Sequence, residues 1–160
     1  MDDVVENHHG TAIAIGGNAA LIRGPSGAGK SDLALRCLAM APTALIPAPA
    51  ARLVADDRVE LKREGQRLRA EAPAAIRGKL EVRGIGIVTV PYVVSAEVVL
   101  IADLVPPDMV ERLPDPPATT DFMGLSLPLL RLAPFEAAAP IKLLLALAQT
   151  LQRPGGVSGP

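Results

Sequence analysis

Aromatic residues are scarce in this chain, and their scarcity argues against one class of nucleic-acid-binding protein. The 160 residues include two phenylalanines, one tyrosine and no tryptophan. Proteins that bind single strands without sequence preference stack successive bases on several aromatic side chains. A basic excess is also missing, since the formal net charge is −1, whereas binding to phosphates requires clustered Lys and Arg. We therefore expect no nucleic-acid partner.

Cysteine and long apolar runs are equally scarce. Cys37 is the only cysteine, which excludes an internal disulfide and a zinc site built from several thiolates. The first ten residues, MDDVVENHHG, are acidic and polar, unlike a signal peptide. No apolar run reaches the roughly 18–20 residues that span a bilayer, because Glu97 and Asp103 interrupt the longest one. We expect a cytoplasmic protein without a membrane partner.

Enough hydrophobic residues are present, at 49%, to bury a core despite 14 glycines and 16 prolines. We therefore expect a single domain over residues 1–150 and a disordered tail over residues 151–160. Helices are predicted from about Lys30 to the prolines that begin at Pro42, and over Ala137–Leu151. The segments expected as strands are Thr11–Ile15, Ala19–Arg23, Arg52–Ala55, Val59–Lys62, Arg67–Ala70, Val98–Leu104 and Leu125–Leu132.

The remaining segments are expected to be largely irregular. Thr43–Ala50 and Pro106–Thr120 are predicted as loops, and Leu80–Val90 as a loop that leads into a strand. Many short strands and few helices indicate a sheet-rich α/β domain, with a mixed sheet and more antiparallel hairpins than a regular βαβ repeat would contain.

The strongest motif is GPSGAGKS at residues 24–31, which matches the phosphate-loop pattern G-x-x-x-x-G-K-[ST] in full. In such a loop, backbone N–H groups surround a phosphate, Lys30 contacts the β- and γ-phosphates, and Ser31 ligates Mg²⁺. The alternative is a glycine-rich turn at the start of a helix. The motif does not separate ATPases, kinases and GTPases, but no guanine-reading element is evident, so ATP is favoured. The predicted nucleotide-binding residues are Gly24, Pro25, Ser26, Gly27, Ala28, Gly29, Lys30 and Ser31.

Three further groups of residues could carry chemistry. Asp56 and Asp57 end a predicted strand, where carboxylates can hold Mg²⁺ or take a proton, or can simply cap a solvated turn. His9 precedes the first predicted strand and, taken alone, is best interpreted as an exposed residue beside His8. Glu81 and Arg83 are two residues apart, so on an extended segment they share a face, either to meet metal and phosphate or as a surface ion pair.

Together these residues resemble the catalytic C-terminal domain of bacterial HPr kinase/phosphorylase. The resemblance rests on His9-Gly10, GPSGAGKSD, LVADD and LEVRGIGIV in this order, and it covers roughly residues 7–90. The segment LPLLRLAPFEAAAP resembles short forms of the family from α-proteobacteria. The resemblance implies a P-loop-containing fold of the HPr kinase / PEP carboxykinase-like type. It also implies a hexamer and, since only eight residues precede His9, a form without the family's N-terminal regulatory domain.

The activity implied by the resemblance is phosphorylation of a serine on HPr, the phosphocarrier of the phosphotransferase system, with ATP and Mg²⁺. Reversal by phosphorolysis is implied as well. Carried over by position, Asp56 is the general base, and His9 lies next to it and tunes it. Glu81 is a second Mg²⁺ ligand beside Ser31. The remaining implied roles are a metal or water contact for Asp57, anchoring of the site for Arg83, and phosphate contact for Lys30.

The family's basic loop with its catalytic arginine has no counterpart after Val90. Arg112 and Arg131 are the arginines that remain for that role. Two alternative functions therefore stay open: a nucleotide-binding sensor module without phosphoryl transfer, and a P-loop kinase that acts on a small molecule.

Overall fold

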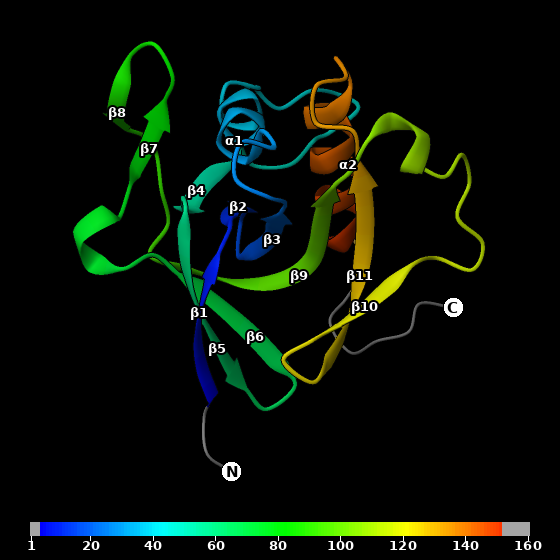
Figure 1. The fold of residues 1–160 in the computed structure, drawn as a ribbon, viewed down its shortest axis with the longest axis horizontal. Coiled ribbons are helices and arrows are strands. Elements are labelled where there is room, and N and C mark those ends of the chain that lie inside the picture. The colour runs from blue at the N-terminus through cyan, green and yellow to red at the C-terminus, as the bar shows by residue number, and fades with distance from the viewer. Residues whose placement is uncertain (1–3, 152–160) are drawn as a thin grey trace.

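The computed structural model describes residues 4–151, which form a curled mixed sheet with two helices packed on it (Figure 1). The described strands of this sheet follow the order β1-β5-β6-β9-β3-β2-β4, and β11, paired with β10, joins at β9. A separate hairpin, β7–β8, projects from the body. The elements are β1 (Val4–His9), β2 (Thr11–Ile15), β3 (Asn18–Arg23), α1 (Lys30–Leu38), β4 (Arg52–Ala55), β5 (Arg58–Glu64), β6 (Arg67–Glu71), a 3-10 turn (Ala74–Ile76), β7 (Lys79–Val82), β8 (Gly86–Thr89), β9 (Ser95–Leu104), a second 3-10 turn (Pro107–Met109), β10 (Thr119–Phe122), β11 (Leu125–Leu132) and α2 (Ala139–Leu151).

The central strands are buried on both faces. In β2, Ile13 and Ile15 face the core under α1 and α2, whereas Ala12 and Ala14 face a second core inside the curl of the sheet. This alternation follows from the two-residue period of a strand. The second core is closed by apolar side chains of β5, β6 and the β10–β11 hairpin. The small alanines of β2 therefore face the second core, and its branched residues face the core under the helices.

Four strands bring their carboxyl ends to one edge of the sheet. β3 is parallel to β9, and β9 is parallel to β11. β4 points the same way as β3, because both are antiparallel to β2. In α/β sheets, ligands bind outside the carboxyl ends of the strands. The phosphate loop follows β3, Asp56-Asp57 follows β4, and Phe135 follows β11, so this edge gathers the groups of interest.

The predicted α/β fold class, with its mixed sheet and antiparallel hairpins, is confirmed. Each segment predicted as a strand lies within or overlaps an observed strand, and both predicted helices are present. The tail was expected over residues 151–160, but Leu151 is the last residue of α2, and residues 152–160 lie outside the described residues.

Three local predictions were wrong. Leu80–Val90 is a β-hairpin, because Gly84 (φ 86°) and Gly86 (φ 116°) allow the chain to reverse. The histidines do not precede the first strand: they end β1, a polar edge strand that pairs antiparallel with β5. The segment expected as a loop up to Thr120 runs into β10 at Thr119.

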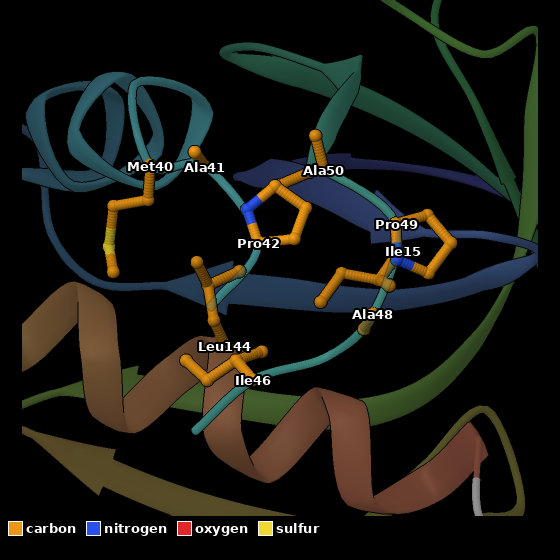
Figure 2. A pocket seen from close by; sticks show the side chains of 10 residues that line it. Ile15, Met40, Ala41, Pro42, Ile46, Ala48, Pro49, Ala50 and Leu144 are labelled. Carbon is orange, nitrogen blue, oxygen red and sulfur yellow. The ribbon is translucent and has the colours of Figure 1, made fainter. Parts of the chain in front are cut away.

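The long segment between α1 and β4 covers one end of the core. Ile46 is buried there, and Figure 2 shows it with Leu144 of α2 and Ile15 of β2 among the residues that line a small void. The void is about 10 Å³ and its wall is mainly apolar. A space of that size holds at most about one water molecule. The predicted loop Thr43–Ala50 is thus a lid on the core rather than a ligand site.

Cys37 of α1 is fully buried, with its Sγ 3.9 Å from the carbonyl oxygen of Pro140. Burial raises the pKa of its thiol from 9.0 to about 12, against a small opposing effect of Arg36. We expect the native protein to resist a thiol reagent at pH 8 and to react once unfolded in urea, because the thiolate is the nucleophile. Equal labelling rates in both states would contradict this.

The same pKa shift gives stability a pH dependence. Because the folded-state pKa of Cys37 is raised, its contribution to the free energy of unfolding is present below pH 9 and is lost as the pH rises toward 12.

Among the described helices, none combines the length and apolar character needed to cross a bilayer.

Candidate active site

The phosphate loop joins β3 to α1 and folds around the amine of Lys30. Gly27 (φ 82°) and Gly29 (φ 101°) have left-handed backbone conformations, which side chains beyond glycine rarely adopt. The Lys30 Nζ donates hydrogen bonds to the carbonyl oxygens of Gly24 (2.7 Å) and Pro25 (2.9 Å), and the residue is only 7% exposed. The N-terminus of α1 follows at once, so its free N–H groups point toward any anion held by the loop.

Asp56 lies at the end of β4 and joins three elements of the site. Its Oδ1 accepts hydrogen bonds from the hydroxyls of Ser31 (2.6 Å) and Thr11 (3.0 Å). Its Oδ2 accepts one from the backbone N–H of Glu81 (3.3 Å). The residue is 7% exposed, and a buried carboxylate is stable only when its lone pairs are satisfied in this way. The three hydrogen bonds that Asp56 accepts therefore link α1, β2 and β7 at the site.

Asp57 points away from Asp56 and has a different partner. Its backbone has a φ of 69°, which turns the chain so that the side chain is 70% exposed. The His9 Nε2 lies 2.7 Å from Asp57 Oδ1, and the Gly10 N–H donates to the Asp57 carbonyl oxygen (3.1 Å). The expected contact between His9 and Asp56 was therefore wrong: the histidine at the end of β1 pairs with the second aspartate of the pair.

The phosphate loop, His9 and Asp57 line one cavity of about 550 Å³. Residues of the phosphate loop, α1, β7 and the segment after β11 contribute to its wall. Asp56, Gly24, Pro25 and Ala28 are not among its lining residues; the carbonyl oxygens of Gly24 and Pro25 face Lys30 instead. The described residues that line it are His9, Thr11, Ser26, Gly27, Gly29, Lys30, Ser31, Asp32, Leu35, Asp57, Glu81, Val82, Arg83 and Phe135.

The three expected metal ligands, Ser31, Asp57 and Glu81, all line the cavity. Within residues 4–151 no three His, Cys, Asp or Glu side chains converge tightly enough to form a ready metal cage. Oxygen atoms suited to Mg²⁺ are nevertheless adjacent, since the Ser31 hydroxyl touches Asp56 and the backbone of Glu81 touches the same carboxylate. A cation there would take ligands from Ser31 and Asp56, with the exposed Glu81 side chain at the rim.

The two arginines considered for the missing basic loop do not reach the cavity. Arg112 is exposed in the segment between β9 and β10, and Arg131 forms an ion pair with Glu111 (3.7 Å). Neither is among the described residues that line the cavity. Arg83 is the arginine that lines it.

Five residues that line the cavity were not predicted as site residues from the sequence: Thr11, Asp32, Leu35, Val82 and Phe135. The sequence pattern marks Thr11 only as the start of an apolar strand, and its polar side chain at a strand end beside His9-Gly10 was the available signal. Phe135 follows the last strand of the sheet and lines the cavity although it lies more than 100 residues from the phosphate loop. Its signal was its rarity as one of two phenylalanines.

Replacing Thr11 with valine is expected to lower the free energy of unfolding by about 1–3 kcal/mol, because a buried charged acceptor would lose one donor. Thr11 is 1% exposed and valine has nearly its shape, so packing changes little. Urea unfolding would measure the effect, with the exposed Thr119→Val as the matched control. A Thr11→Val protein as stable as that control would show that Asp56 does not depend on this hydroxyl.

Comparison with known proteins gives a family for this arrangement. The model of the HPr serine kinase C-terminal domain family matches residues 4–150. The chain belongs to this family. The solved structure of the HPr(Ser) kinase/phosphatase from Coxiella burnetii is similar over 92% of this chain and 96% of that chain, with a TM-score of 0.69 and 27% sequence identity. The expected fold type and family resemblance are therefore confirmed.

Curated members of the family match a shorter stretch of this chain than the family model does. The HPr kinase/phosphorylase of an Exiguobacterium species is 45% identical over 83 residues, which are 51% of this chain and 24% of that protein. The HPr kinase/phosphorylase of Clostridium tetani is 38% identical over 92 residues, 58% of this chain and 27% of that protein. The matched region thus spans about a quarter of the length of these relatives.

Proposed function

We propose that this protein is a serine protein kinase that transfers the γ-phosphoryl group of ATP to HPr, with Mg²⁺. The observation that carries the proposal is the His9–Asp57 pair, which faces the same cavity as Lys30 and Ser31. This pair would supply a base with an orienting partner in the cavity that the phosphate loop also lines. The family membership and the names of the relatives support HPr as the substrate.

Phosphoryl transfer demands positioning and charge stabilisation rather than covalent chemistry by the protein. The amide groups of the phosphate loop and Lys30 hold the phosphates. Ser31 and Asp56 would hold the cation, with Glu81 at the rim of the cavity, and bound Mg²⁺ would offset the negative charge of the phosphates. Arg83 adds positive charge on the hairpin side of the cavity.

Asp57 takes the proton from the attacking serine hydroxyl in this proposal. Its carboxylate is accessible, and His9 fixes one of its oxygens. Asp56 cannot reach a substrate hydroxyl as easily, because it is buried and already accepts three hydrogen bonds. The roles implied by the resemblance are therefore exchanged: Asp57 is the base and Asp56 belongs to the metal side.

In phosphorolysis, inorganic phosphate would attack the phosphorus of phosphoserine, the bond to the serine oxygen would break to give pyrophosphate, and the same Asp57 would return a proton to the serine oxygen. We extend the proposal to this reaction because one group that accepts a proton forward must donate it backward. The hexamer implied by the family resemblance is proposed as well, and light scattering of the purified protein tests it.

The test is incubation of the purified protein with HPr, Mg²⁺ and γ-labelled ATP, followed by addition of phosphate. Phosphoserine on HPr, formed by the protein and by an Arg112→Ala control, supports the proposal. ATP binding without transfer to any carrier protein would instead identify a nucleotide-binding sensor. Transfer to a small molecule with none to HPr would identify a small-molecule kinase.

A further inference from the structure

We propose that the ring of Phe135 is the platform on which the base of the bound nucleotide stacks. The inference rests on the proposed function, since it places the rest of a nucleotide whose phosphates the loop holds. Phe135 lines the cavity and is 72% exposed. The other phenylalanine, Phe122, is buried between the strands.

The position of the ring relative to the phosphate loop is the first support. A Cβ atom on Gly29 would lie 2.9 Å and 3.0 Å from the Cζ and Cε1 of Phe135, so the ring lies directly on the backbone of the loop. Gly29 immediately precedes Lys30, at the start of α1. Because the loop amides would hold the phosphates, the ribose and base would lie in the same cavity, which the ring of Phe135 also lines.

The topology is the second support. Phe135 lies three residues after β11, which ends at the same edge of the sheet as β3. In α/β sheets the ligand lies across this edge, at the ends of neighbouring strands. One strand end thus supplies the phosphate loop and another supplies the aromatic ring.

The backbone on both sides of the ring is tied to α1. The Arg36 guanidinium donates hydrogen bonds to the carbonyl oxygens of Pro134 and Glu136 (the latter at 3.5 Å), and it is held by Asp32 (3.0 Å). The ring is therefore presented by a segment anchored to the helix that follows the phosphate loop. A preorganised aromatic face costs little further ordering when a base stacks on it.

A single exposed apolar side chain needs no explanation by itself. Leu113, for example, is 83% exposed and lies outside the cavity. Phe135 differs because it combines exposure with contact to the phosphate loop in one cavity. Since every base has a π-face, the ring selects for a nucleobase in general, and we expect similar affinities for ATP and GTP.

The experiment compares binding of ATP and of inorganic tripolyphosphate, each with Mg²⁺, by titration calorimetry. Phe135→Ala is expected to weaken ATP binding by roughly 5- to 150-fold, the range typical for loss of base stacking. Its affinity for tripolyphosphate, which has no base, should stay within about twofold. Phe135→Trp should retain ATP affinity, and Leu113→Ala serves as the matched exposed control.

Two outcomes would overturn the inference. Equal weakening of both ligands would show that Phe135 only shapes the phosphate loop. Unchanged ATP binding in Phe135→Ala would place the base elsewhere, for example against Leu35 and Val82, the aliphatic residues of the cavity wall. Neither outcome bears on transfer to HPr by the wild-type protein, so the proposed function stands or falls separately.

Discussion

Replacing Asp57 with asparagine is expected to lower the rate of serine phosphorylation by about 10²- to 10⁴-fold, the range for loss of a general base. Asparagine has the same shape but cannot accept the proton. ATP binding should persist, because Asp57 is exposed and makes no contact with the phosphate loop in the structure. The measurement is kcat for transfer to HPr together with the Kd for ATP.

Two companion variants make this result decisive. Asp108→Asn changes an exposed aspartate outside the cavity and should leave kcat unchanged. Asp56→Asn should instead raise the Mg²⁺ concentration required and lower the stability, because Asp56 accepts the Ser31 and Thr11 hydroxyls. If Asp57→Asn transferred phosphate normally while Asp56→Asn lost only the proton-transfer step, the exchange of roles between the two aspartates would be wrong.

Replacing Lys30 with alanine is expected to reduce transfer by at least about 10²- to 10³-fold, comparable to removing one preorganised donor from a developing charge. Lys30 is the buried cation of the loop, and the lysine of such a loop contacts the β- and γ-phosphates of a bound nucleotide. ATP binding should weaken too, unlike in Asp57→Asn. Single-turnover assays with saturating ATP would separate the loss of binding from the loss of transfer.

Stability must be followed in the same variant. Lys30 donates to two loop carbonyls, so its removal also leaves the loop less well held. Lys142→Ala, which removes an exposed lysine of α2 that pairs with Glu136, is the matched control. A folded Lys30→Ala protein that transferred phosphate at the wild-type rate would exclude a phosphate-loop mechanism.

Much of the fold was predictable because its central strands have clear apolar patterns. Thr11–Ile15 and Val98–Leu104 are buried on both faces, and their runs of β-branched and small residues showed this directly. β1 was not predictable, since an edge strand that is exposed along its length shows no alternation. The β7–β8 hairpin could not be predicted for a similar reason. Ile85 and Ile87 are exposed, so the segment lacks the alternation of a half-buried strand, and its glycines are typical of a loop.

Sequence motifs pointed to many of the residues that line the cavity, but they did not predict that His9 pairs with Asp57. Adjacent aspartates at a strand end can each take either role. The positive φ of Asp57, which turns its side chain toward His9, depends on the tight turn between β4 and β5. Phe135 could not be joined to the phosphate loop by spacing, because the parallel pairing of β3, β9 and β11 is a long-range feature.

The dispersed origin of the cavity has a consequence for how the chain acquires activity. Its walls come from β1, the phosphate loop, the β4–β5 turn, the β7 strand and the segment after β11, which span most of the described sequence. Pairings such as β3 with β9 join residues about 80 positions apart, and such non-local contacts form slowly, since the entropy of closing long loops is lost first. A growing chain thus displays its phosphate loop well before the segment that carries Phe135 has been made. Catalytic competence therefore arrives with the last steps of folding.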